Sequence, residues 1–452
     1  MSCPFRQPES DTTPAAGGPG STQKPLQAAP VAPPDKTAPQ VVLPNDYHFS
    51  PIDVKYASSK HRKVQKKEAD LGVLSDFPGV WTGIGYNQIF RPNSGTTPTV
   101  LPIPVNPPAP APPNEAILEL NLTRETLSFS APLGDIPNRG FGGKQDDIFL
   151  NGVQYVQSVD DIANPETGGR DGDPVNIHIE NGMWMHVPET VDPVLPASVS
   201  RMGTIPHGTS INAQGVQRGT TDGPPPLDPV SITPFPIGNP GNLIRFDSQT
   251  ATKNDTARLP QDLSKFIAAG TITQELLDDP VAILRDAIKD QKITKTTTIF
   301  ISTNPSDALH GVPVQDDGTS NIAFLTGTFA NATNTEPNSN ALHMDAVFWI
   351  ETVEYEIEIP AWKKGHKPLH IQPKQLGPVT PLPTFEVKPP CEIKKPLKIK
   401  VEAKQIQYSQ LVNLDFGGLT WPHRSVATLV PQALVPVPES AFPKSHHGAL
   451  DD

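Results

Sequence analysis

The sequence predicts an all-β protein: a closed antiparallel β-barrel with a small helical insertion and long proline-rich loops. Short runs that alternate apolar and polar residues recur from Phe77 to Val430, separated by Pro, Gly, Asn and Asp clusters. The 452 residues include 55 prolines, more than twice the usual share of about 5%. That proline content excludes a helical bundle or a coiled coil. About ten or more such strands favour closure of the sheet, because a closed barrel has no exposed edges.

The composition divides the chain into a barrel domain and two tails. Residues 1–70 are rich in Pro, Ala, Gly and Ser, with a basic run from Lys60 to Lys67, and they predict a disordered tail and lead-in. Residues 71–438 form the single predicted barrel domain, and residues 439–452 form a C-terminal tail. A barrel of this size has an interior wide enough for a ligand.

Alternation marks the individual strands. Ile117 to Phe129 reads ILELNLTRETLSF, with Leu118, Leu120 and Leu122 on one face and a tight turn expected at Arg124 and Glu125. The same pattern predicts further strands over Asp147–Val156, Val175–Val187, Val199–Ile205, Ser210–Val216, Thr296–Ser302, Val347–Ile359, Ile406–Phe416 and Ser425–Val430.

One segment departs from the strand pattern. Residues 260–291 carry Leu, Ile and Phe at spacings of three and four, and Asp262 and Asp279 are placed to cap helices. We expect two short helices here, packed over one end of the sheet. The Pro-rich or polar stretches 92–114, 217–242, 303–320 and 361–398 are too long for hairpin turns and predict long loops.

Charge and cysteine content limit the partners and the compartment. Lys and Arg total 36 against 48 Asp and Glu, a net charge of −12, which disfavours nucleic-acid binding. Cys3 and Cys391 lie in a predicted tail and a predicted loop, so a disulfide framework is excluded. The first residues lack the apolar core of a signal peptide, and no apolar run approaches the roughly 20 residues of a membrane span. We expect a soluble, cytoplasmic protein.

Two segments at opposite ends of the predicted barrel stand out. In Phe77-Pro-Gly-Val-Trp-Thr-Gly-Ile-Gly-Tyr86, Trp81, Gly83 and Gly85 share one strand face, and glycine there lets a large group approach the backbone. In Leu419-Thr-Trp-Pro-His-Arg-Ser-Val-Ala-Thr-Leu429, His423 lies at a strand entrance and can point into a cavity. The alternative is a histidine that only binds a backbone carbonyl.

These segments resemble the nitrobindin group of heme-binding β-barrels. That family opens with a Gly-x-Trp-x-Gly-x-Gly strand, matched by Gly79, Trp81, Gly83 and Gly85, and closes with a Leu-Thr-x-x-His-x-x-x-Ala-x-Leu strand, matched from Leu419 to Leu429. The stretch from Ile177 to Val187 is similar to the family's His-x-Glu-x-Gly strand pair. The resemblance covers only part of this longer chain. It implies heme b with His423 as the axial metal ligand, and Trp81, Gly83, Gly85 and Thr420 as cofactor-binding residues.

The distal side of such a heme site decides its chemistry. An apolar wall would favour nitric oxide binding or peroxynitrite isomerisation, as the resemblance implies, and a histidine or arginine would favour peroxide cleavage by moving a proton. The candidates for that catalytic role are His207 and Arg91, although His207 before Gly208 also fits an ordinary turn. His178 and His186 would share a strand face, but Gly182 indicates a turn between them.

Three hypotheses remain open at this point. The first is a heme-b-binding barrel that acts on nitric oxide, peroxynitrite or peroxide at a histidine-ligated iron, as a peroxynitrite isomerase or a peroxidase-like enzyme. The second is a non-enzymatic calycin-like carrier of an apolar small molecule. The third is a structural all-β protein whose interior is filled by side chains.

Overall fold

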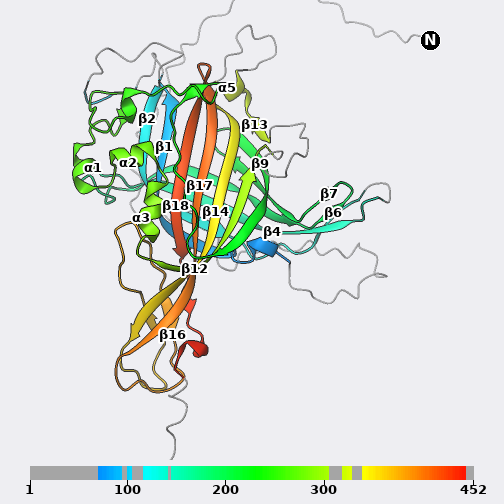
Figure 1. Cartoon of the computed structure of the whole chain (residues 1–452), viewed down its shortest axis with the longest axis vertical. Coiled ribbons are helices and arrows are strands. Elements are labelled where there is room, and N and C mark those ends of the chain that lie inside the picture. Colours follow the sequence, from blue (N-terminus) through cyan, green and yellow to red (C-terminus); the bar gives the residue numbers. More distant parts are fainter. Residues whose placement is uncertain are drawn as a thin grey trace, which may run out of the picture. The chain divides into compact units, whose positions relative to one another are not determined.

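Ten antiparallel strands close into a barrel in the computed structural model of the chain (Figure 1). They follow one another around the ring in chain order, and the ring closes where the first strand pairs with the last, Gly83 lying opposite Leu429. The barrel strands are β1 (Gly79–Pro92), β2 (Ala116–Phe129), β4 (Ile148–Asp161), β5 (Val175–Val187), β8 (Ser198–Ile205), β9 (Thr209–Asp222), β12 (Lys292–Ser302), β14 (Asn340–Ile359), β17 (Leu397–Phe416) and β18 (Leu419–Pro431). This arrangement confirms the predicted fold class.

The structure describes residues 70–93, 99–103, 116–140, 144–304, 318–327 and 338–443. The predicted N-terminal tail up to residue 69, its basic run and Cys3 lie outside these residues, as do residues 444–452 of the predicted C-terminal tail. The first five residues of that tail are described, and Phe442 among them is 6% exposed. Cys391 is a free thiol. Within the described part of the chain, none of the helices has the length and apolar character needed to cross a bilayer.

The lower half of the barrel interior is packed solid. We call the end at which β1 begins the lower end, and the opposite end, which carries α5 (Ala323–Thr326), the upper end (Figure 1). Inward-facing side chains of the lower half form an inner core that includes Trp81, Leu127, Phe129, Trp184 and Phe348. The segment before β1 closes this end, because Phe77 packs against Phe129 and Trp184 with ring centroids 4.8 and 5.4 Å apart.

The outer face of the barrel carries a second apolar core. Residues 223–291, between β9 and β12, pack over β1, β2 and β18, and their buried side chains contact Tyr86, Phe90 and the three leucines of β2. This insertion holds β10 (Phe235–Pro236), β11 (Arg258–Leu259), α1 (Ser264–Ala269), α2 (Gln274–Asp278) and α3 (Ala282–Ile288). Three short helices therefore replace the two predicted, since the polar stretches around Thr271 and Asp279 each break the run.

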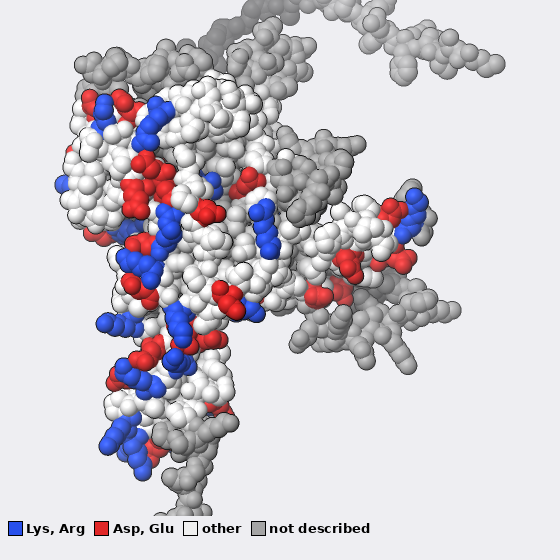
Figure 2. All heavy atoms as spheres, viewed as in Figure 1, with Lys and Arg blue, Asp and Glu red and all other residues white. Residues whose placement is uncertain are grey.

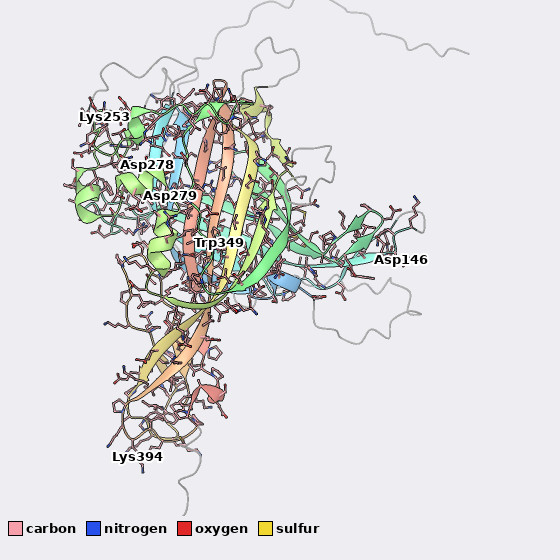
Figure 3. The ribbon with its side chains drawn as sticks, in the orientation of Figure 1. Asp146, Lys253, Asp278, Asp279, Trp349 and Lys394 are labelled. Carbon is pink, nitrogen blue, oxygen red and sulfur yellow. The ribbon has the colours of Figure 1, made fainter. Side chains whose placement is uncertain are left out.

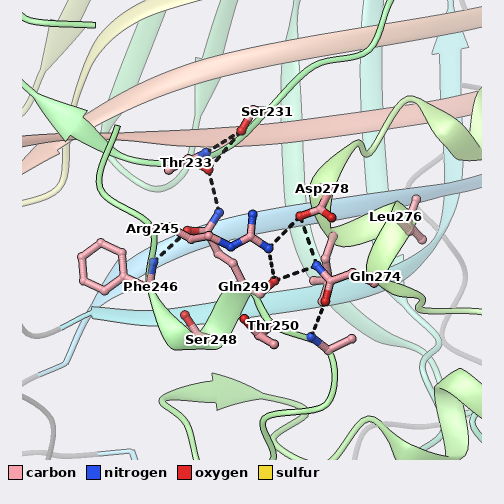
Figure 4. Close-up of polar contacts among 12 residues, drawn as sticks. Ser231, Thr233, Arg245, Phe246, Ser248, Gln249, Thr250, Gln274, Leu276 and Asp278 are labelled. Atoms are coloured by element: carbon pink, nitrogen blue, oxygen red, sulfur yellow. Dashed lines mark hydrogen bonds and ion pairs between the residues drawn. The ribbon is translucent and has the colours of Figure 1, made fainter. Parts of the chain in front are cut away.

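Hydrogen bonds from side chains to the backbone hold the insertion together. The guanidinium of Arg258, 0% exposed, donates to the carbonyls of Ser248, Thr250, Lys253 and Gln261 at 2.8–3.0 Å. Figure 4 shows a neighbouring set, in which the amide of Gln249 bonds to Thr233 and Gln274 reaches the Gln249 carbonyl. These bonds satisfy loop carbonyls that burial would otherwise leave unpaired.

Strands β14 and β17 extend past their neighbours at the lower end. Their pairing continues to Ile359 opposite Leu397, where the exposed face carries ion pairs of Glu354 with Lys292 and Lys400. Figure 2 shows the two charge signs interleaved along this face, and Figure 3 places Lys394 near the far end of the extension. A small sheet of β15 (Leu369–Ile371), β16 (Phe385–Val387) and β19 (Val435–Pro436) covers its apolar side.

The remaining strands are short. They are β3 (Ile136–Asn138), β6 (Thr190–Val191), β7 (Val194–Leu195) and β13 (Thr319–Asn321), and β13 pairs with β9. Single turns of 3-10 helix lie at Gly72–Leu74, Asp247–Gln249 and Glu439–Ala441.

Two predicted turns are wrong. Arg124 and Glu125 lie inside continuous β2, paired with Ile84 and Gly83 of β1. Gly182 lies inside continuous β5, opposite Gly203, where a side chain would collide with the Met202 carbonyl at 1.9 Å. Glycine here permits close strand contact and does not end the strand.

Candidate ligand cavity

A cavity of about 390 Å³ occupies the upper half of the barrel interior. Its volume falls within the range of sites that hold a small organic molecule. Residues of nine barrel strands, all except β12, line it, together with residues of α5, of the turn between β8 and β9 and of the segment just before β14. The barrel is therefore filled below and hollow above.

The cavity wall is divided by polarity. Apolar side chains of β8, β9, β14, β17 and α5 line one part of it, namely Ile205, Ile211, Phe324, Leu325, Ala341, Met344, Val412 and Leu414, although β9 and β17 also contribute Thr209, Tyr408 and Gln410. Polar side chains gather on β18, β1, β2 and β4, namely Asn87, Arg91, Glu119, Asn121, Gln157, His423 and Ser425. The cavity therefore offers both apolar surface and hydrogen-bonding groups.

His423 lies on the polar wall, within β18. Its Nε2 atom accepts a hydrogen bond from Asn87 Nδ2 on β1 at 2.8 Å, and the same amide nitrogen donates to Ser425 Oγ at 2.9 Å. Burial in the wall, followed by the charges of His178 and His207, lowers the pKa of His423 to about 3. The imidazole is therefore neutral at pH 7, the form in which histidine binds a metal.

Two further histidines line the cavity across from His423. His207 follows β8, which lies five strands from β18 in either direction around the ring, and His178 lies on neighbouring β5. Their rings stack with centroids 5.7 Å apart. Burial, with a smaller effect of His178, lowers the pKa of His207. The cavity thus lies between the imidazole of His423 on the polar wall and the imidazoles of His178 and His207 on the opposite wall.

A layer of hydrogen-bonded polar residues separates the cavity from the inner core. We call Glu125, Tyr155, Gln157, Glu180, Arg201, Tyr408 and Gln410 the polar layer. On one side of it, Arg201 Nη2 lies 2.8 Å from Glu180 Oε1, and Arg201 Nε donates to Tyr155 Oη at 3.0 Å. Burial alone would raise the pKa of Glu180, but the charge of Arg201, the hydrogen bond and charge of His178 and the hydrogen bond from Tyr155 together outweigh it, and the pKa falls to about 2. His178 Nε2 lies 3.5 Å from the second oxygen of Glu180.

The other side of the polar layer holds a carboxyl group with a different environment. Tyr408 Oη donates to Glu125 Oε2 at 2.6 Å, and Thr123 Oγ1 donates to Glu125 Oε1 at 3.1 Å. Burial raises the pKa of Glu125, while the hydrogen bonds from Tyr408, Thr123 and Gln157 oppose this effect. The environments of these two buried glutamates therefore shift their pKa values in opposite directions.

The upper rim carries a charged pair and a short helix. Arg91 forms an ion pair with Glu119, and Arg91 Nη2 donates to Thr99 Oγ1 at 2.6 Å. Leu325 of α5 is buried over the cavity, while Phe324 beside it is 65% exposed. Arg91 reaches the cavity as the sequence suggests, but Glu119 neutralises its charge.

The other predicted cofactor-binding residues lie away from the cavity. Trp81 is in the inner core, where its Nε1 atom donates to the Phe77 carbonyl at 2.9 Å. A side chain at Gly83 or Gly85 would collide with the carbonyls of Thr428 or Val426 at 2.0 and 2.2 Å, so both glycines allow β18 to approach β1 closely. Thr420, 5% exposed, pairs with Phe235 and does not line the cavity.

Several residues that line the cavity were not predicted from the sequence. Asn87 lies on the same strand face as Trp81, Gly83 and Gly85, so the alternation of β1 could have predicted that it points into the barrel. Tyr408 and Gln157 belong to ordinary strand patterns, and nothing in their spacing connects them with Glu125. His186, considered beside His178, lies at the lower end of β5, where its Nδ1 atom is 3.0 Å from the Asp70 carbonyl oxygen.

Neither a search for metal-binding clusters nor comparison with known proteins assigns a function to the cavity. Among the described residues, no group of three or more His, Cys, Asp or Glu side chains is placed to hold a metal ion. The chain matches no protein-family model, no curated protein and no solved structure. The chain is therefore a ten-stranded meander barrel with a cavity of the size of a small molecule, and the nitrobindin resemblance remains a prediction.

Proposed function

We propose that the protein binds heme b in the upper cavity, with His423 as the axial ligand, as in the nitrobindin family that its end motifs resemble. The observation that carries this proposal is the placement of one neutral histidine opposite two others across a cavity with a largely apolar second wall. Histidine is a common axial ligand of heme iron, and apolar walls favour a large aromatic macrocycle.

One contact must change for this proposal to hold. Asn87 Nδ2 donates to His423 Nε2 at 2.8 Å, so the lone pair that would bind iron is already occupied. Asn87 has alternative partners, because the same nitrogen reaches Ser425 Oγ and its oxygen lies 3.3 Å from Asn121 Nδ2. A rotation of the Asn87 side chain would release the imidazole and leave the amide hydrogen-bonded.

The protein's own residues would then perform two tasks. His207, with its pKa lowered by burial, is neutral at pH 7 and can accept a proton from a small molecule in the cavity. Glu180 orients His178 from behind and is itself fixed by Arg201. When bound, heme would supply an iron centre that takes nitric oxide, peroxynitrite or peroxide.

The test is the absorption spectrum of the purified protein after addition of hemin. We expect a Soret band and saturable binding, and loss of both in His423→Ala. His186→Ala is the matched control, because this histidine lies at the lower end of the barrel, outside the cavity. Asn87→Val should strengthen hemin binding, since it frees Nε2. A Soret band that survives in His423→Ala would exclude the proposed ligand.

A metal-free carrier is the second candidate, and the Asn87–His423 hydrogen bond favours it. In that case Asn87, His423 and Ser425 form a polar wall that recognises hydrogen-bonding groups of an apolar ligand. The protein would then show no hemin band but would bind the fluorescent dye 1-anilinonaphthalene-8-sulfonate. Ile211→Trp, which fills the cavity from the apolar wall, would abolish dye binding.

A further inference from the structure

The floor of the cavity carries a polar group that the proposed heme site does not use. Tyr408, from β17, reaches across the barrel interior, and Gln157 Nε2 from β4 donates to its Oη atom at 3.0 Å. Tyr408 and Gln157 line the cavity, whereas Glu125 lies behind them and is 1% exposed. A ligand that reaches the floor therefore meets Tyr408 first, and meets Glu125 only through it.

Glu125 and Glu180 differ in their neighbours. Among the residues that the structure describes, no Lys or Arg forms an ion pair with Glu125, whereas Arg201 contacts Glu180 directly. The partners of Glu125 are a hydroxyl from Thr123, a hydroxyl from Tyr408 and an amide from Gln157. A buried carboxyl without a cation favours its neutral form, and burial accordingly raises the pKa of Glu125.

A neutral carboxyl group changes the direction of the hydrogen bonds at the floor. Protonated Glu125 can donate to Tyr408 Oη, an atom that also accepts a hydrogen bond from Gln157. With two bonds accepted, the Tyr408 hydroxyl hydrogen is available to an atom in the cavity. Donors of this kind, fixed in a site that excludes water, bind an anionic oxygen strongly.

We propose that Tyr408, backed by Glu125 and Gln157, is a binding site for the oxygen of a phenol, held as the phenolate. The aromatic ring of the ligand packs against the apolar wall of Ile211, Met344 and Val412 above the floor. The phenol releases its proton to solvent, Glu125 keeps its own proton, and no covalent bond forms. This site requires neither iron nor His423 and therefore goes beyond the heme proposal.

The test uses 4-nitrophenol, whose phenolate absorbs at a longer wavelength than the neutral phenol. At a pH below the pKa of free 4-nitrophenol, we expect the wild-type protein to increase the phenolate band in a saturable manner. Tyr408→Phe should weaken binding at least about tenfold, the factor that one hydrogen bond to a charged oxygen supplies. Tyr86→Phe is the matched control, because it removes a buried hydroxyl from the outer core and should leave the dissociation constant unchanged.

The outcomes separate this site from the heme site. Equal dissociation constants for wild type and Tyr408→Phe, or binding of 4-nitrophenol only in its neutral form, would overturn the proposal. Should Tyr408→Phe not fold, 4-nitrotoluene replaces it as the comparison, and the wild-type protein must bind this analogue at least about tenfold more weakly than 4-nitrophenol. Saturable phenolate binding by a wild-type protein that shows no Soret band with hemin would support this site where the heme proposal fails.

Discussion

The two halves of the barrel interior are formed by the same strands but differ in packing and polarity. In the lower half, aromatic side chains such as Trp184 and Phe348 pack edge to face, with ring centroids 5.0 Å apart. In the upper half, the same strands enclose an open cavity lined partly by amides, histidines and a charged pair. The lower half stabilises the closed sheet, so the upper half can leave apolar surface uncovered.

The polar layer between the halves makes this division stable. Arg201 lies over the rings of Tyr155, Trp184 and Phe348, at 5.3–5.8 Å from their centroids, while its guanidinium binds Glu180 and Gln410 on the cavity side. It therefore contacts both regions at once. A charged group in this position costs desolvation energy unless each of its partners is present.

The largest effect is expected from removal of the Arg201 charge. Arg201→Met keeps most of the packing but leaves the carboxylate of Glu180 buried without a cation, so the free energy of unfolding should fall by about 3–5 kcal/mol. Chemical denaturation measures this change. Addition of Glu180→Gln in the same chain should restore most of the loss. A double variant as unstable as the single one would show that packing and not charge is responsible.

A matched pair of isoleucines compares the two halves directly. Both belong to the inner core, but Ile299, on β12, is 0% exposed and does not line the cavity, whereas Ile211, on neighbouring β9, is 5% exposed and does. Ile299→Ala creates a void in a packed region and should cost about 2–5 kcal/mol. Ile211→Ala only enlarges an existing space and should cost less than about 2 kcal/mol. Equal losses in denaturation experiments would mean that the upper half is as tightly packed as the lower.

Much of the fold follows from the sequence, but the faces of its strands do not. In β2, Leu118, Leu120 and Leu122 are buried on the outer face, while Leu127 and Phe129 are buried on the inner face. This change of apolar face midway along one strand imitates a turn, which explains the wrong prediction at Arg124 and Glu125. Only the insertion, which covers the upper outer face, makes outward leucines favourable, and periodicity cannot reveal such a cover.

The candidate site, like the fold, could be predicted from the sequence only in part. His423 and Arg91 line the cavity because each lies on the inward face of a strand that the end motifs identify. Glu125 and Tyr408 are 283 residues apart in the chain, and their hydrogen bond depends on closure of the barrel. Spacing along a sequence carries no information on such a pair, and the polar layer therefore becomes visible only in the structure.

The pH dependence of stability tests the upper half through His423. Its pKa is about 3 in the folded protein and about 6.5 in an unfolded chain. Between these values the unfolded chain binds a proton that the folded protein does not, so stability is complete above pH 6.5 and falls as the pH decreases. By pH 5 the loss from this group amounts to up to about 2 kcal/mol.

His423→Asn removes this titration and should lose less stability than wild type between pH 7.5 and pH 5, as measured by denaturant unfolding at each pH. His186→Asn, at the closed lower end, is the control and should follow the wild-type curve. Parallel curves for wild type and His423→Asn would mean that the imidazole takes up a proton in the folded protein and is not shielded by the wall.

The smallest effect concerns Trp81, which the end motif suggests as a cofactor contact and the structure places in the inner core. Trp81→Phe removes the hydrogen bond to the Phe77 carbonyl, so it should lower the free energy of unfolding by about 1 kcal/mol. Hemin or dye binding in the cavity should not change, because the polar layer lies between this position and any ligand. A variant of nearly normal stability that loses ligand binding would contradict the division of the interior, since it would connect the packed half directly to the site. An unchanged ligand affinity would mean that the tryptophan of the motif closes the barrel, and that ligand binding depends on the histidines and amides of the opposite end.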